Sequence, residues 1–139
     1  MSILKPFKEL NEFLASEGIK HFKGKELVTG RLRGNRIPIK NLWDNIIPTL
    51  NVLDTARDKF GSIKINSCYR NEIYNRKVGG ASKSKHKLFK ACDIKPLNAS
   101  LDVVASWLEE NIPSDKWGLR LYETFIHIDC RSDYKYRDI

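Results

Sequence analysis

The sequence predicts a single α+β domain in which a small antiparallel sheet is flanked by helices. Three observations predict this fold class. Apolar residues recur at helical spacing in residues 5–17, 41–60 and 98–111. They alternate with polar residues near residues 61–68 and 117–130, as in strands with one buried face. The 139 residues contain no linker, repeat or low-complexity run, so residues 1–139 are expected to share one core.

The N-terminal half is predicted to be mainly helical. Residues 1–20 contain a first amphipathic helix over 5–17, with its apolar face made by Phe7, Leu10, Phe13 and Leu14. Residues 21–40 are polar and rich in glycine, which favours a loop. A second helix covers residues 41–60, with Asn41 as its cap. Pro48 predicts a short entry turn before the main helix.

The C-terminal half is predicted to alternate strands with short helices. We first expect a strand ending near Cys68, a helix over 71–78 ended by Gly79 and Gly80, and a basic loop over 81–90. A short strand over 91–94 and a helix capped by Asn98 or Ser100 and reaching Asn111 should follow. The chain should then form a hairpin of 117–122 and 125–130 and end in a peripheral tail over 132–139. In the 98–111 helix, the buried stripe is expected to be Val103, Val104, Trp107 and Leu108.

The charge balance points to an anionic partner without naming it. The chain has 25 Lys and Arg against 17 Asp and Glu, a net charge of +8. This charge is spread thinly, for example over Arg31, Arg33 and Arg36, and no nucleic-acid motif accompanies it, so no nucleic-acid partner is expected. No stretch approaches the roughly 20 apolar residues of a membrane span. No signal peptide is recognisable, so we expect synthesis in the cytoplasm. We also expect the protein to be a monomer.

The cysteines argue against a disulfide scaffold. Cys68, Cys92 and Cys130 are an odd number and form no C-x-x-C pair. We therefore expect reduced thiols and no thiolate zinc site. A cysteine protease built on Cys92 or Cys130 with His127 is disfavoured, because strand alternation turns Cys130 away from the face that carries His127.

Two of the three histidines lie near aspartates in segments that can meet in space. His86 precedes Asp93 by seven residues, and His127 precedes Asp129 by two. Strand alternation places His127 and Asp129 on one face, so both side chains can point into the same cleft. Two imidazoles and one carboxylate suit a zinc ion that keeps a fourth position for water, which favours a hydrolase. The same residues could also be ordinary polar groups of a half-buried strand and a basic loop.

Three ordered blocks of the chain resemble one family. Residues 84–93 (SKHKLFKACD) resemble its S-x-H-x-x-G-x-A-x-D signature at four of five fixed positions. Residues 67–81 look like its S-G-Y-R-S-x-E-Y-N-x-x-V-G-G segment, and residues 125–131 (FIHIDCR) are similar to its F-V-H-V-D-x-R strand. The family is that of zinc D-Ala-D-Ala carboxypeptidases, which includes VanY-like and VanX-like peptidases and phage endolysin peptidases. The likeness covers nearly the whole chain.

The resemblance implies a fold shared with the hedgehog signalling domain and a set of site residues. Zinc (Zn²⁺) would be held by His86, Asp93 and His127. Arg70 would receive a carboxylate of the substrate, a role that suits its planar guanidinium. Ser84 would orient the loop or bind substrate, and Tyr69 would pack near the cleft.

Two departures from the family pattern concern catalysis. Many relatives place an acidic residue three positions before the last ligand, where this chain has Thr124. Asp129 is therefore the favoured general base and Glu123 the weaker candidate, although Asp129 could instead hydrogen-bond a ligand imidazole. Phe89 replaces the signature glycine, which requires a shifted loop or a narrowed cleft if that position needs a positive φ.

The function implied by the resemblance is zinc-dependent cleavage of peptidoglycan stem peptides. The enzyme would be a D-Ala-D-Ala carboxypeptidase or an endopeptidase of the endolysin type. A chain without a signal peptide would be brought to the cell wall by phage lysis or on a virion. The alternative is a catalytically impaired binding or virion-structural module that keeps the fold, with or without the metal.

Overall fold

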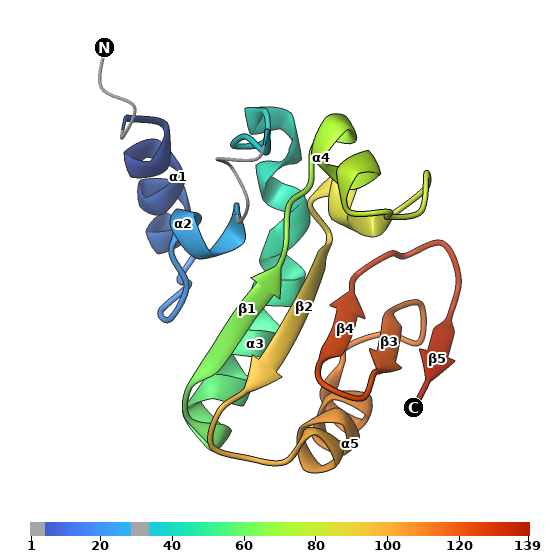
Figure 1. Cartoon of the computed structure of the whole chain (residues 1–139). Coiled ribbons are helices and arrows are strands. Elements are labelled where there is room, and N and C mark those ends of the chain that lie inside the picture. The colour runs from blue at the N-terminus through green and yellow to red at the C-terminus, as the bar shows by residue number, and fades with distance from the viewer. Residues whose placement is uncertain (1–4, 29–33) are drawn as a thin grey trace.

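The computed structural model describes residues 5–28 and 34–139, so Arg31 and Arg33 of the predicted loop lie outside the described residues (Figure 1). The helices are α1 (Lys5–Ser16), α2 (Gly24–Leu27), η2 (Lys40–Ile46), α3 (Ile47–Phe60), α4 (Glu72–Lys77), η3 (Lys85–Leu88) and α5 (Leu101–Asn111). The strands are β1 (Ile63–Ser67), β2 (Ala91–Pro96), β3 (Gly118–Leu121), β4 (Ile126–Asp129) and β5 (Tyr136–Asp138). The α+β class with helices beside one sheet is confirmed.

The five strands form one sheet in the order β1-β2-β4-β3-β5. The first four are antiparallel to their neighbours, whereas β5 lies parallel to β3 at the edge. Strand alternation sends one set of side chains into the core against α3 and α5, namely Ile65, Cys92, Ile94, Leu119, Ile126 and Ile128. The opposite set carries Asp93, His127 and Asp129, so the polar face of the sheet is free to hold a site.

The long helix begins through a separate turn, as predicted. Pro48 occupies the first turn of α3, where its missing N–H removes no intrahelical hydrogen bond, and η2 precedes it. The prediction of Asn41 as the cap is wrong, because η2 begins after Ile39 and no side chain caps this end. Burial of Leu50, Leu53 and other residues of the apolar stripe holds the helix instead.

The two predicted C-terminal helices are capped by side chains. Asn71 accepts a hydrogen bond from the Tyr74 N–H, and Ser100, rather than Asn98, accepts one from the Val103 N–H. The predicted stripe of α5 is wrong at Val103, which is 54% exposed, while Ala105 is buried. The helix is rotated so that Val104, Ala105 and Leu108 face the core.

Residues 132–139, predicted as a peripheral tail, include strand β5. The Tyr136 N–H donates to the Trp117 carbonyl, and the Tyr134 and Tyr136 rings lie 4.6 and 4.9 Å from the guanidinium carbon of Arg131. Polar composition concealed this packing, because the partner of the rings is a cation and not an apolar side chain. The segment is therefore an ordered edge of the sheet.

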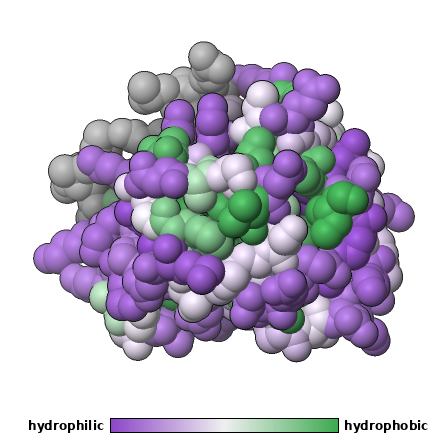
Figure 2. Space-filling view, turned by 90° about the horizontal axis from the view of Figure 1, so that it is seen from below, coloured by the Kyte–Doolittle hydropathy of each residue, from purple (hydrophilic) through white to green (hydrophobic). Residues whose placement is uncertain are grey.

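The surface at the lower end of the sheet in Figure 1 carries an apolar patch. Figure 2 shows this patch surrounded by hydrophilic residues. Leu97 and Val103 are exposed there, and the partly buried Phe60 and Trp107 rings meet edge to face. Within the described residues, no helix is both long and apolar enough to span a membrane.

Candidate metal centre

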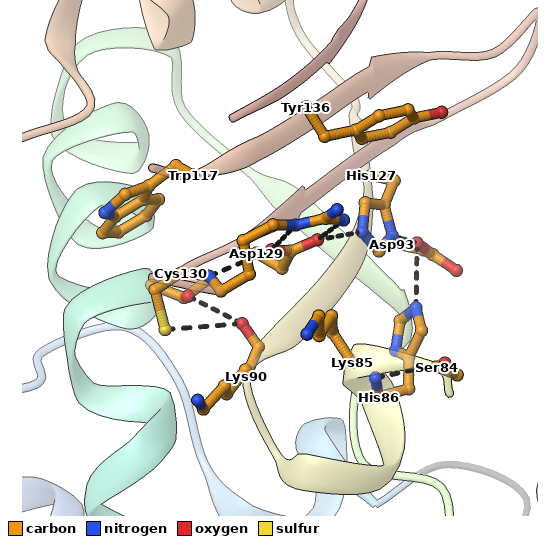
Figure 3. Close-up of polar contacts among 12 residues, drawn as sticks. Ser84, Lys85, His86, Lys90, Asp93, Trp117, His127, Asp129, Cys130 and Tyr136 are labelled. Carbon is orange, nitrogen blue, oxygen red and sulfur yellow. Dashed lines mark hydrogen bonds and ion pairs between the residues drawn. The ribbon is translucent and has the colours of Figure 1, made fainter. Parts of the chain in front are cut away.

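Strand pairing brings two predicted ligands together. Asp93 of β2 lies directly opposite His127 of β4 in the antiparallel register, on the face away from α3. Asp93 Oδ1 is 2.9 Å from His127 Nδ1. His86, from η3, reaches the same oxygen with its Nε2 at 3.2 Å. Figure 3 shows the three side chains converging.

The His86 ring is fixed by its own backbone neighbourhood. Ser84 caps η3 by accepting the His86 N–H, and the His86 Nδ1 lies 2.6 Å from the Cys68 carbonyl oxygen. A carbonyl only accepts, so Nδ1 carries the proton and Nε2 offers its lone pair to the site. Burial lowers the pKa of His86, which keeps the ring neutral, the form that binds metals.

His127 is held from the opposite side. Its Nε2 lies 2.7 Å from Asp129 Oδ2, so a proton on Nε2 is held there and Nδ1 is turned toward Asp93. Burial alone would lower the pKa of His127, but hydrogen bonds to Asp129 and Asp93 outweigh it and raise this pKa to about 8. A metal ion must therefore displace a proton from Nδ1 at neutral pH.

These three side chains fit a zinc ion. Burial opposes ionisation of Asp93, yet the hydrogen bond from His127 keeps its pKa well below the usual range, so it is a carboxylate. Each of the three residues offers one ligand atom, and these atoms lie within 4.8 Å of one another. Two imidazole nitrogens and one carboxylate oxygen form a donor set of catalytic zinc sites, which leave a position open.

The comparison with known families agrees with this geometry. A family model described as Peptidase M15 matches residues 20–129, which include all three candidate ligands. The chain belongs to the peptidase M15 family. The earlier resemblance to the zinc D-Ala-D-Ala carboxypeptidases is thereby confirmed. Comparison with curated proteins and with solved structures gives no significant match.

The candidate ligands of this M15 peptidase line a pocket of about 500 Å³. This volume is typical of small-ligand sites. His86, Asp93 and His127 lie in its wall together with Arg70, Lys83 and Ser84. The pocket also contains Lys85, Tyr122, Tyr134 and Tyr136, which sequence reasoning missed. Tyr134 and Tyr136 alternate along the C-terminal segment, and this pattern was the sequence signal for two of these lining residues.

Arg70 is placed beside the ligands by the irregular end of β1. The register shifts between Ile65 and Ser67, and Ser67 then lies opposite Asp93. The Arg70 guanidinium donates to Ser67 Oγ at 3.0 Å and to Asp93 Oδ2 at 3.3 Å. A Cβ at Gly80 would lie 2.9 Å from Arg70 Nη1 and 2.1 Å from Asn75 Oδ1, so glycine is required for this packing.

Neither candidate general base faces the pocket. Asp129 is fully buried behind His127, and Arg131 donates to both of its oxygens at 2.8 and 2.7 Å. Burial opposes ionisation of Asp129, but the hydrogen bonds from Arg131 and His127 hold its pKa well below the usual range. Glu123 lines a separate shallow pocket beside α5. Among the described residues that line the metal pocket, Asp93 is the only carboxylate.

Phe89 adopts a left-handed backbone, the conformation that favours glycine. Its φ of 58° and ψ of 47° are left-handed, and its N–H closes η3. The side chain is fully buried and meets the Tyr69 ring edge to face, with centroids 5.8 Å apart. The Phe89 ring therefore points into the core and does not narrow the pocket. Tyr69 packs under this loop and is not among the pocket-lining residues.

The cysteines are free thiols on the core side of the sheet. Cys92 and Cys68 are buried with their sulfurs 3.5 Å apart, and their hydrogen bond together with burial raises the pKa of Cys92. Cys130 Sγ points to the Asn45 carbonyl, and burial raises its pKa. No thiolate is therefore presented to His127, which argues against a cysteine protease.

Proposed function

We propose that this M15 peptidase is a zinc-dependent hydrolase of peptidoglycan stem peptides, acting as a D-Ala-D-Ala carboxypeptidase or as an endopeptidase. The observation that carries the proposal is the convergence of His86, Asp93 and His127 at the wall of one pocket, with Arg70 beside them. Bound there, zinc would act as a Lewis acid toward water and the scissile carbonyl. The protein would reach the cell wall through phage lysis or on a virion.

The charges of the pocket suit a peptide that carries carboxylates. The Arg70 side chain is 16% exposed and presents a fixed planar fork beside Asp93. Lys83 is exposed at the rim, whereas Lys85 is paired with Asp133. Ser67 and Asn75 hold the Arg70 side chain in place, so its guanidinium can donate to a terminal carboxylate without a further loss of side-chain freedom. Arg70 is therefore the proposed anchor of the substrate.

One observation favours the second candidate, a binding module with lost or altered activity. A hydrolase of this type usually has a carboxylate that takes a proton from the attacking water. Among the described residues that line the pocket, Asp93 is the only carboxylate, and it is already a candidate ligand. The two candidates therefore differ in turnover and not in metal binding.

Digestion of purified peptidoglycan by the zinc-loaded protein, followed by mass spectrometry, tests the proposal. Loss of one terminal D-Ala per stem peptide would identify a carboxypeptidase, and cleavage inside the stem or cross-link an endopeptidase. An intact wall, with one zinc bound per chain, would favour the binding module. A protein that neither binds zinc nor cuts the wall would contradict both candidates.

Arg70→Lys is expected to weaken substrate binding more than turnover. A lysine keeps the charge but cannot make two parallel hydrogen bonds to a carboxylate. Loss of one charged hydrogen bond of about 1.5–3 kcal/mol predicts a KM raised roughly 10- to 100-fold. Steady-state kinetics on a stem peptide measure this, with the same peptide amidated at its C-terminus as the control. If both peptides lose equally, Arg70 does not bind the terminal carboxylate.

A further inference from the structure

The buried pair of Asp129 and Arg131 connects the candidate metal centre to the C-terminal edge of the sheet. Asp129 Oδ2 contacts His127 Nε2, while Arg131 donates through Nε and Nη2 to the two Asp129 oxygens. The Arg131 N–H adds a third hydrogen bond to Asp129 Oδ1 at 3.1 Å. A fully buried carboxylate with this many donors has one fixed orientation, and so has the imidazole bonded to it.

The guanidinium of Arg131 itself packs against two aromatic rings. It is 7% exposed, and the Tyr134 and Tyr136 rings lie 4.6 and 4.9 Å from its central carbon. Figure 3 shows Tyr136 on the side of His127 away from Lys90. Both tyrosines and Arg131 lie after residue 129, where the match to the family model ends.

The neighbouring strand has made room for this pair. Gly118 of β3 lies opposite Asp129 in the antiparallel register. A Cβ at Gly118 would lie 2.4 Å from Asp129 Oδ2 and 2.6 Å from Arg131 Nη2, closer than real atoms approach. No side chain larger than hydrogen is compatible with the pair, so three elements, β3, β4 and the C-terminal segment, are fitted to one another here.

We propose that Arg131 and the tyrosines of residues 131–136 form a clamp that acts through Asp129 to hold His127 with its Nδ1 toward the metal position. The inference rests on the proposed zinc site and assigns positioning roles to Asp129, Arg131 and Gly118. It gives Asp129 a role different from that of a general base. It also brings Tyr134 and Tyr136, which lie beyond both the family match and the family-like strand of residues 125–131, into the support of the metal centre.

The test is zinc affinity of the full chain, measured by competition with a chromophoric chelator. Asp129→Asn and Arg131→Met are each expected to weaken zinc binding roughly 10- to 100-fold, as for other partners that orient metal-ligand histidines. Because Arg131 acts through Asp129, the double variant should lose no more than the weaker-binding single variant. Gly118→Ala should weaken binding in the same way from the neighbouring strand.

Arg137→Met is the matched control. Arg137 belongs to β5, and its guanidinium pairs with Glu109 and the Trp117 carbonyl, away from His127. This variant removes a partly buried arginine pair from the same segment and should bind zinc as the wild type does. Circular dichroism before zinc addition identifies any variant that has not folded.

A spectroscopic measurement separates positioning from general stability. In long-range proton–nitrogen spectra of the zinc-loaded protein, the His127 proton should reside on Nε2 and exchange slowly with water. That protection should persist in Arg137→Met and be lost in the Arg131 variant. Folded Asp129 and Arg131 variants with wild-type affinity and protection would overturn the clamp, whereas a wild type that takes up no zinc would overturn the proposed function instead.

Discussion

Replacing His86 or Asp93 with alanine is expected to abolish stoichiometric zinc binding and to reduce any peptide hydrolysis to background. Each change removes one of three donor atoms that lie within 4.8 Å of one another. The apparent free energy of zinc binding to a complete structural site, as in zinc fingers, is about 10–16 kcal/mol. Loss of one donor out of three is therefore expected to lower the zinc affinity by several orders of magnitude. Metal analysis of the purified variants, with the wild type at one zinc per chain, measures the effect.

His21→Ala is the matched control for this experiment. His21 also pairs with a carboxylate, with Nε2 2.7 Å from Asp58 Oδ1, but this pair is on the surface away from the pocket. The control removes a histidine and an ion pair and should keep both zinc and activity. Equal zinc loss in His21→Ala and His86→Ala would show that the three converging residues are not the metal site.

Phe89→Gly is expected to destabilise the protein although it restores the residue typical of the family signature. Relief of the left-handed backbone of Phe89 gains about 1–2 kcal/mol. Removal of a fully buried phenylalanine ring costs about 3–5 kcal/mol, and glycine adds about 0.5–1 kcal/mol of backbone entropy. The net loss of about 3 kcal/mol corresponds to a Tm roughly 10 °C lower, which thermal unfolding measures.

Ser132→Gly isolates the backbone contribution. Ser132 is the other described non-glycine residue with a positive φ, at 63°, and it is exposed. Its replacement relieves the same kind of strain without removing a buried ring, and the entropy cost of glycine, about 0.5–1 kcal/mol, offsets much of that gain, so the free energy of unfolding should change by about 1 kcal/mol or less. A Phe89→Gly protein more stable than the wild type would show that backbone strain, and not ring burial, dominates at this loop.

Local patterns predicted most of the elements because each depends on neighbouring residues. The hairpin of β3 and β4 followed from alternation, and α4 from Asn71 at its start and glycines at its end. Errors arose where a distant partner decided the outcome. The rotation of α5 depends on which face meets the sheet, and β5 forms because tyrosine rings pack on Arg131.

The candidate site divides in the same way. The sequence by itself determined the candidate ligand types and their approximate places, because two of the three motif blocks contain His86, Asp93 and His127 and the strand period turns His127 and Asp129 to one side. Only the tertiary structure decided that Asp129 is buried behind His127 and bonded to Arg131, that Glu123 faces another surface, and that Phe89 points into the core. Spacing along the chain fixes a face, whereas the partner of a charged side chain depends on contacts between strands distant in sequence.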